Sequence, residues 1–258
     1  MLKGIDHVVI VVHDLDRASA DFAAMGFTVV RGGEHTGGVT HNALVAFEDE
    51  SYLELVAFMD APPEEHPFYR KHGEEGLVTF ALLPEDIVAD VAAIERRGLD
   101  LEGPRRGGRT RPDGVNIEWE TAWSGTRDLP FLCADVTARD LRVPHGPARL
   151  HANGVKGIAG VTIAVADLKA SAPRYAALLG VTQERSGASA SESIADFKVG
   201  EGDRAATITL VEPVGGPIEA YYETRGEGPF SLALRADALS AADSFDPERM
   251  HGVLMGVV

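Results

Sequence analysis

The order of apolar and polar positions near the start of the chain changes from a strand period to a helix period. Residues 5–12 are β-branched and apolar apart from Asp6 and His7, a composition typical of a buried strand. Asp14 is a candidate helix N-cap, and Gly26 stands where a helix commonly ends. The apolar residues between them recur every three or four positions and are Leu15, Ala18, Phe22 and Met25. The pattern predicts a strand, a helix, and a second strand over residues 27–30.

The same order of strand, aspartate, helix and glycine recurs along the whole chain. The aspartates that open the predicted helices are Asp14, Asp86, Asp167 and Asp237. Two of the copies are similar in sequence: GIDHVVIVVHDL at residues 4–15 aligns with GIAGVTIAVADL at residues 157–168. An α+β protein without internal repeats is the alternative, but it would rarely show such regular spacing. The chain is therefore predicted to consist of repeats of one small unit.

Strand-like segments follow the helix in the first three units. They span residues 27–33, 41–47 and 51–58 in the first, 115–123 and 129–136 in the second, and 181–186, 193–200 and 205–213 in the third. In the second unit, residues 103–114 read as a loop rich in glycine and arginine. The fourth unit has room only for a strand, an alanine-rich helix and a final strand. We predict an α+β fold of tandem βαβββ modules with the last module truncated.

A linker is expected over residues 143–147, which combine two prolines with a glycine. It divides the chain into two paired-module domains, residues 1–148 with the candidate site and residues 149–258. The second pair is interpreted as degenerate, serving structure, dimerisation or pocket closure. If the second pair serves dimerisation, the protein is expected to form a homodimer.

The charge balance narrows the range of partners. The chain has 258 residues, with 24 basic against 40 acidic side chains and a formal net charge of −16. Nucleic acid and anionic membranes are not expected as partners, because both require a basic face. Cys133 is the single cysteine, so no internal disulfide forms and a reducing compartment such as the cytoplasm is expected. No apolar run is long enough to span a membrane, and the start lacks a signal-peptide layout.

Paired βαβββ units with a histidine on the first strand and a glutamate on the fourth resemble the vicinal oxygen chelate superfamily. This group includes glyoxalase I, extradiol dioxygenases, fosfomycin-resistance enzymes and bleomycin-binding proteins. The chain looks like its glyoxalase-like domain over about residues 4–136. The matching stretches are IDHVVIVVHDLD, HTGGVTHNALVAF, YLELVAF, EGLVTFALLPEDI and RPDGVNIEW. The resemblance implies a cup formed by curved sheets, in which ligands from first and fourth strands hold a divalent cation.

His7 and Glu54 are the candidate metal ligands. Glu54 is a carboxylate inside an apolar strand, between Leu53 and Leu55. A buried charge is costly unless it is paired or bound to a cation. With His7 it forms half of a nitrogen and oxygen site that suits Zn, Mn, Fe, Ni or Co. The alternative is a histidine satisfied within its strand and a glutamate exposed on an edge.

The repeat does not supply a second pair of ligands. Seven residues before each later helix-opening aspartate stand Thr79, Gly160 and Phe230. Thr209 aligns with Glu54 in the third unit, and Leu132 or Cys133 does so in the second. A third ligand is expected from a loop or strand histidine, with His41 first, His35 second and His66 as the remaining candidate. Asn42 beside His41 adds a polar group for substrate binding.

Four arginines and two tryptophans follow in the second unit. The arginines are Arg105, Arg106, Arg109 and Arg111, and a guanidinium binds carboxylate or phosphate with two hydrogen bonds. Arg111 is the candidate catalytic arginine that orients an anionic group, and Arg109 is a substrate-binding candidate. Trp119 and Trp123 share one strand face and would line an apolar or aromatic pocket. If the other face of this strand points into the cup, Glu118 or Glu120 faces the cup and becomes a candidate acid or base. The alternatives without a functional role are that the arginines lie in a solvated loop and that the tryptophans pack in the core.

Three functions compete at this stage. The first is a divalent-metal-dependent lyase or isomerase acting on a small oxygenated molecule, with Glu54 also placed among the catalytic residues; a ring-cleaving dioxygenase is the second choice of chemistry. The second is a metal-free small-molecule binding protein of the bleomycin-resistance type. The third is an interaction or scaffold protein whose cup is vestigial. Dinucleotide-binding, P-loop and nucleophile-elbow motifs do not occur.

Overall fold

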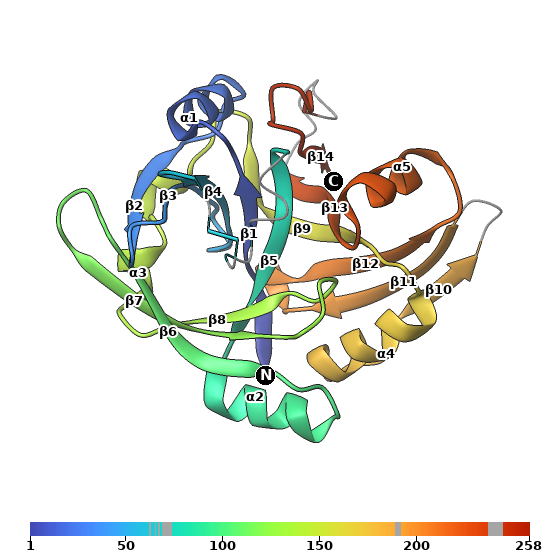
Figure 1. Ribbon diagram of the computed structural model, residues 1–258. Coiled ribbons are helices and arrows are strands. Elements are labelled where there is room, and N and C mark those ends of the chain that lie inside the picture. The colour runs from blue at the N-terminus through green and yellow to red at the C-terminus, as the bar shows by residue number, and fades with distance from the viewer. Residues whose placement is uncertain (62, 65, 67, 69–73, 189–191, 237–244) are drawn as a thin grey trace.

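The computed structural model covers residues 1–258 and describes all of them except 62, 65, 67, 69–73, 189–191 and 237–244 (Figure 1). The first two modules close into one barrel. The first comprises β1 (Leu2–Val11), α1 (Leu15–Ala24), β2 (Val30–His35), β3 (Thr40–Ala46) and β4 (Tyr52–Phe58). The second comprises β5 (Gly76–Pro84), α2 (Ile87–Arg96), β6 (Glu102–Thr110), β7 (Asn116–Trp123) and β8 (Phe131–Asp135). The strand order β1-β4-β3-β2-β6-β7-β8-β5 joins β5 back to β1.

The remaining residues form an open sheet beside the barrel (Figure 1). The connection contains α3 (Arg139–Arg142) and a 3-10 turn, η2 (Gly146–Arg149). Then follow β9 (Val155–Ala164), α4 (Leu168–Leu179), β10 (Arg185–Ala188), β11 (Glu192–Val199), η3 (Gly202–Arg204) and β12 (Ala206–Pro213). The last elements are α5 (Gly216–Arg225), β13 (Gly228–Ala236) and β14 (Leu254–Val257). The strand order is β10-β11-β12-β9-β13-β14. The predicted α+β fold of βαβββ modules is confirmed.

The aspartates that open the repeat act as helix N-caps. The side chain of Asp14 accepts hydrogen bonds from the backbone N–H groups of Asp16 and Arg17. Asp86 and Asp167 make the same two bonds at the starts of α2 and α4. These contacts satisfy N–H groups that have no partner inside the helix. Asp237 and the predicted alanine-rich helix after it fall on residues 237–244, outside the described residues.

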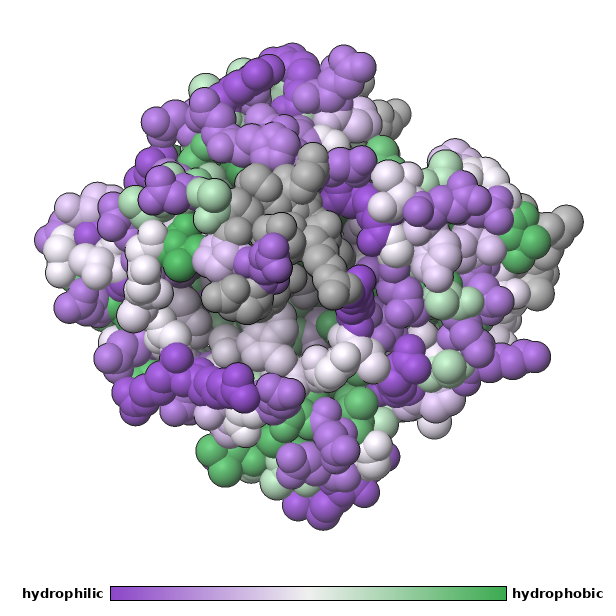
Figure 2. Space-filling model, in the orientation of Figure 1, coloured by the Kyte–Doolittle hydropathy of each residue, from purple (hydrophilic) through white to green (hydrophobic). Residues whose placement is uncertain are grey.

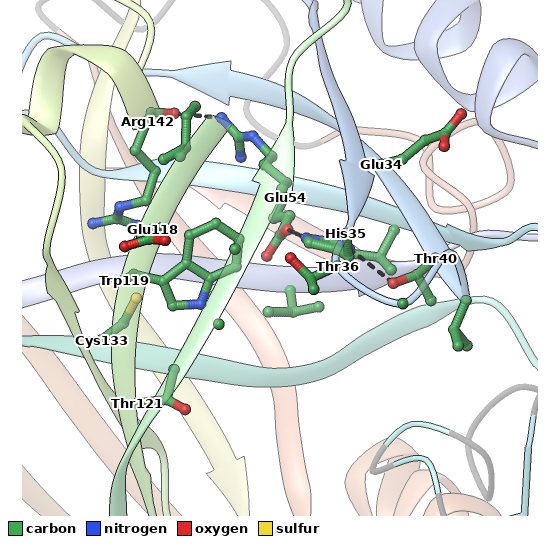
Figure 3. Close-up of a pocket in the computed structure, with 18 of the residues that line it drawn as sticks. Glu34, His35, Thr36, Thr40, Glu54, Glu118, Trp119, Thr121, Cys133 and Arg142 are labelled. Atoms are coloured by element: carbon green, nitrogen blue, oxygen red, sulfur yellow. Dashed lines mark hydrogen bonds and ion pairs between the residues drawn. The ribbon is translucent and has the colours of Figure 1, made fainter. Parts of the chain in front are cut away.

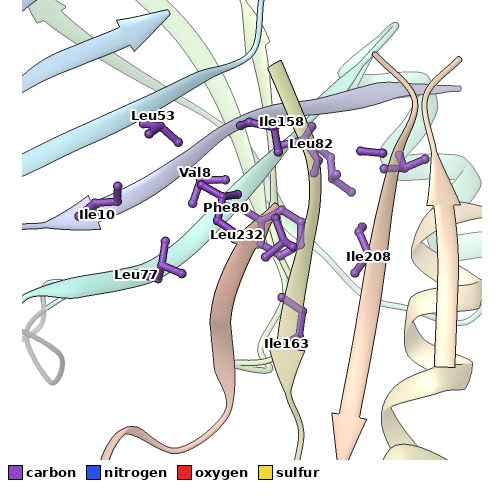
Figure 4. Close-up of a cluster of buried hydrophobic side chains, with 14 of the residues drawn as sticks. Val8, Ile10, Leu53, Leu77, Phe80, Leu82, Ile158, Ile163, Ile208 and Leu232 are labelled. Atoms are coloured by element: carbon purple, nitrogen blue, oxygen red, sulfur yellow. The ribbon is translucent and has the colours of Figure 1, made fainter. Parts of the chain in front are cut away.

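One apolar core joins the barrel to the open sheet. Val8 and Ile10 on the outer face of β1, together with Phe80 and Leu82 of β5, belong to the same cluster as the inner residues of β9 and β13. Figure 4 shows the two sets of side chains lying between the sheets, including Ile158, Ile163, Ile208 and Leu232. Since nearly all of these side chains are inaccessible to water, their burial is a main source of stability.

Several local predictions are wrong. Residues 103–110 are not a loop but most of β6, which pairs with β2 and β7 and completes the barrel. The strand expected over residues 27–33 is β2, but it starts only at Val30 and runs on to His35. α5 has no counterpart in the predicted elements. The expected linker at residues 143–147 lies in the connection between the barrel and the open sheet and leads into η2. Glycine favours turns locally, but backbone pairing across the barrel outweighs that preference here.

The surface agrees with the large share of charged residues in the sequence. The face seen in Figure 2 is mainly hydrophilic, with small apolar areas such as the one over α2 at its lower edge. Within the described residues, no helix combines the length and apolarity that crossing a membrane requires.

Candidate active site

The barrel holds a partly open cavity of about 920 Å³. One side is lined by inward-facing residues of β1 and β4, and the other by β6, β7 and β8. Figure 3 shows Glu54 and His35 side by side at this space, joined by a dashed line, with Trp119 and Thr121 on another strand. The volume is within the range of small-molecule sites.

His7 is held rigidly on the cavity wall. Its ring stacks on Tyr52 with centroids 4.6 Å apart and meets the edge of Phe131 at 5.4 Å. Its Nδ1 lies 2.7 Å from Oδ2 of Asp6, which is an acceptor, so Nδ1 carries the proton and donates. The other nitrogen, Nε2, lines the cavity and lies 3.4 Å from Oε2 of Glu54.

Glu54 lies between two histidines. Its Oε1 is 3.3 Å from Nε2 of His35 and accepts a 2.6 Å hydrogen bond from Nδ2 of Asn42. Burial by itself raises the pKa of Glu54, but the hydrogen bonds from His35 and Asn42 and the charges of His7 and His35 outweigh it and lower the pKa to about 2. The carboxylate is therefore ionised at neutral pH, and a pKa this low makes it a weak base, which suits a cation ligand better than a general base.

The donor types suit a divalent cation. In the part of the chain that the structure describes, however, the ligand atoms of His7, His35 and Glu54 do not all lie within 4.8 Å of one another, so these side chains would have to move closer around an ion. When His7 is neutral, with its proton on Nδ1, its Nε2 presents a lone pair toward a Glu54 oxygen at 3.4 Å; when His7 is cationic, Nε2 donates a proton to that oxygen instead. Two acceptors that face each other repel unless a proton or a cation lies between them. An imidazole whose second nitrogen donates to a carboxylate is the usual arrangement around protein-bound metals. His35 is similarly held, with Nδ1 2.8 Å from Oγ1 of Thr40.

A buried ionic network supports Asp6 from behind. Arg142 is 1% exposed and donates to both oxygens of Asp6, to Tyr52 Oη at 2.7 Å and to Asp135. Arg139 adds a 2.7 Å ion pair to Asp6. Although burial opposes ionisation, the two guanidinium groups hold the pKa of Asp6 well below its usual range. Sequence reasoning missed this network; its one local signal is an aspartate directly before His7 in an apolar strand.

The structure brings most of the predicted site residues together. His7, Glu54, Arg109, Trp119 and Trp123 all line the cavity, while fully buried Asn42 reaches it through its hydrogen bond to Glu54. The prediction that the strand face with Trp119 and Trp123 points into the cavity is therefore correct. His66, the remaining histidine candidate, also lines the cavity, and Glu118 does so at a position where it pairs with Arg106.

Two predicted residues lie elsewhere. His41 is not among the cavity-lining residues, and its Nδ1 lies 3.4 Å from Nη2 of Arg31. Adjacent strand residues point to opposite faces, so the inward position of Asn42 turns His41 outward. The ranking of His41 above His35 is wrong. Arg111 is likewise outside the lining and pairs with Asp113 at 2.6 Å, so it does not face the cavity, where the prediction that it orients an anionic group would need it.

Comparison with known proteins identifies the family. A family model described as "Glyoxalase-like domain" matches residues 5–179. The chain belongs to this family. Its fold is that of the vicinal oxygen chelate superfamily.

Solved structures agree on the fold of this glyoxalase-like domain protein. A hypothetical protein from Staphylococcus aureus has a TM-score of 0.75 and 16% identity, covering 100% of this chain and 99% of its own. A variant of 4-hydroxymandelate synthase from Streptomyces coelicolor has a TM-score of 0.64 and 16% identity, covering 93% of this chain and 73% of its own. At these identities the likeness shows the fold alone. No curated protein matches the chain.

In this glyoxalase-like domain protein the second module contributes an aromatic wall. Val9 pairs with Glu54 in the first module, and the corresponding pair in the second is Ala81 with Phe131. The alignment of Glu54 with Leu132 or Cys133 is therefore wrong by one or two positions. Phe131 stacks on Trp123 with centroids 4.1 Å apart and ring planes 6° apart. The place of a second carboxylate is taken by an aromatic ring.

Cys133 lies near His7 and Asp6, close enough for the three to form a metal-ligand cluster by distance alone. Burial raises the pKa of the Cys133 thiol to about 12, so it is a neutral thiol at neutral pH. Asp6 is already bound by two arginines. Of the two groupings, His7, His35 and Glu54 therefore offer the better donor set.

Proposed function

We propose that this protein is a divalent-metal-dependent lyase or isomerase that acts on a small oxygenated molecule in the barrel cavity. The observation that carries the proposal is the convergence of His7, His35 and Glu54. Each oxygen of Glu54 faces the Nε2 atom of one histidine, at 3.4 Å and 3.3 Å. A set of two histidines and one carboxylate is a common catalytic metal site that leaves positions for substrate and water.

Each residue has a defined role in this proposal. His7, His35 and Glu54 hold the ion, and Asn42 orients the Glu54 carboxylate through its hydrogen bond. Asp6 positions His7 and keeps the proton on Nδ1. A bound divalent ion supplies Lewis acidity that polarises adjacent oxygens of the substrate. This set accepts Zn, Mn, Fe, Ni or Co.

Metal analysis of protein purified without chelators tests the proposal. We expect one ion per chain in the wild type, and loss of that ion in His7→Ala and Glu54→Ala. Thr209→Ala is the matched control, because Thr209 occupies the register position of Glu54 in the open sheet. His41→Ala should also retain the metal. A wild type without bound metal, unchanged in thermal stability by every added divalent ion, would contradict the proposal.

The second candidate is a ring-cleaving dioxygenase, favoured by the presence of His35 beside Glu54. Two histidines and one carboxylate are the ligand set of non-haem Fe(II) oxygenases. Oxygen uptake by Fe(II)-loaded protein with catechols, abolished in His35→Ala, would select it over a lyase or isomerase. If organic molecules but no divalent ion raise the melting temperature, the protein is instead a metal-free binding protein of the bleomycin-resistance type.

A further inference from the structure

Arg109 differs from the other arginines of its segment. Arg105 pairs with Glu102 at 3.1 Å, Arg106 with Glu118 at 2.8 Å, and Arg111 with Asp113 at 2.6 Å. All three are exposed or half-buried. Arg109 is only 4% exposed, and among the described residues it forms no ion pair.

The guanidinium of Arg109 is incompletely satisfied. Nη2 donates to the backbone carbonyl of Arg142 at 2.7 Å, while Nε is buried with no partner among the described residues. A guanidinium has five N–H donors, so the single bond to Arg142 leaves most of its capacity unused. Burial lowers the pKa of Arg109; nearby Tyr52 and Glu54 oppose that shift, and Arg142 adds to it. A buried cation without a counter-ion is costly, and an anionic ligand would remove that cost.

The chain places an aromatic surface on the same wall of the cavity. Gly107 precedes Arg109 by two positions on β6, so both face inward. Gly107 pairs with Trp119, and a Cβ on Gly107 would lie 2.7 Å from Nε1 of that indole. The missing side chain therefore provides the room that the Trp119 ring occupies. Trp123 and its stacked partner Phe131 extend the aromatic surface.

These neighbours define one ligand class. A planar ring packs on aromatic faces, and a single carboxylate matches a guanidinium fork. Because Arg106 is already paired with Glu118, the cavity offers one uncompensated arginine among the described residues, which favours a monoanion over a polyphosphate. The hydrogen bond to the Arg142 carbonyl satisfies one N–H group of Arg109, but it does not account for the burial of the unpaired Nε.

We propose that Arg109 is the carboxylate receptor for an aromatic carboxylic acid that packs its ring against Trp119 and Trp123. The reaction that this acid undergoes rests on the proposed function, whereas its binding by Arg109 does not. It assigns Arg109 to specificity rather than to chemistry.

Binding of simple probes to metal-free protein in EDTA tests the proposal. Phenylacetate, its neutral amide phenylacetamide, and the non-aromatic acid cyclohexylacetate are titrated, with tryptophan fluorescence and calorimetry as readouts. We expect the wild type to bind phenylacetate about 10- to 100-fold more tightly than phenylacetamide, the usual range for a charged hydrogen bond. Cyclohexylacetate should bind more weakly than phenylacetate.

Arg109→Met should abolish the preference for the acid while leaving phenylacetamide affinity unchanged, which shows that the cavity is intact. Arg105→Met is the matched control, because its partner Glu102 lies outside the cavity, and it should retain the preference. Equal binding of acid and amide by the wild type, or a preference that persists in Arg109→Met, overturns the proposal.

The same titrations in His7→Ala separate this proposal from the metal site. A preference that survives in His7→Ala and is lost in Arg109→Met supports Arg109 even if the protein holds no metal. If the preference appears only after a divalent ion is added and is unaffected by Arg109→Met, the ion is the receptor and the proposal for Arg109 fails.

Discussion

The barrel and the open sheet share one strand register but use the corresponding face differently. In the barrel, His7 pairs with Tyr52 and Val9 with Glu54. In the open sheet the same parallel pairing joins Gly160 to Thr207 and Thr162 to Thr209. A Cβ on Gly160 would lie 2.5 Å from the carbonyl oxygen of Thr207, so this position does not accept a ligating side chain without backbone movement.

The two faces are also covered differently. The inner face of the barrel strands borders the cavity and its ionised groups. In the open sheet, the corresponding face carries Ala164 and Val211, against which Ile218 of α5 packs. The helix thus covers with apolar side chains a face that the barrel leaves open to a ligand. The comparison indicates that the polar cluster requires closure of the sheet and a buried ionic network, and the open sheet has neither.

Removal of Arg142 should give the largest loss of stability, because it disrupts the ionic network that the open sheet lacks. Arg142→Met leaves Asp6, Asp135 and Tyr52 without their shared donor. Breaking a buried ion pair on one side destabilises a protein by about 3–5 kcal/mol. The free energy of unfolding in urea measures the effect. Arg106→Met, which removes an exposed pair with Glu118, should cost about 0–1 kcal/mol; equal losses in the two variants would show that the network has no special role.

A core substitution in the open sheet tests whether the two regions fold together. Leu232 is 2% exposed and lies in the core shared with the barrel. Leu232→Ala should destabilise the protein by about 2–5 kcal/mol. Trp119 and Trp123 both lie on β7, so their fluorescence reports on the barrel alone. We expect the fluorescence and far-UV dichroism midpoints to fall together; an unchanged fluorescence midpoint would mean that the barrel folds independently.

Paired polar substitutions should give the smallest effects. Asn42→Ala removes the donor to buried Glu54 and should cost about 1.5–3 kcal/mol, as for hydrogen bonds to charged groups. Thr209→Val removes a 2.8 Å bond to the half-buried Asp196 in the open sheet and should cost about 0.5–1.5 kcal/mol. Denaturation measured side by side ranks them. The reverse order would contradict the claim that the barrel interior depends more on its polar contacts.

The sequence predicted the repeat and half of the site for identifiable reasons. The N-cap aspartates and the helical spacing after them are local signals, and they were correct at Asp14, Asp86 and Asp167. His7 and Glu54 were found because a polar residue in an apolar strand is conspicuous. His35 was ranked too low, because β3 is apolar on both faces over residues 43–46 and parity there does not reveal which face is inward.

Other elements depend on partners that are distant along the chain. Residues 102–110 contain four glycines or prolines and four charged residues, and they form a strand only because β2 and β7 pair with them. Arg142 lies 136 positions from Asp6, and no local pattern indicates that the two meet. The pairing of Phe131 with Ala81 required the register between β5 and β8.

The sequence by itself therefore determined the repeated module, the starts of α1, α2 and α4, and the inward position of a histidine and a glutamate, because hydrophobic periodicity and capping act over a few residues. Only the tertiary structure decided which modules close into a barrel, that His35 rather than His41 joins the cluster, and that Arg109 is buried without a counter-ion. These outcomes depend on strand register and on burial among residues far apart in the chain. A one-residue change in register turns every side chain of a strand to the other face.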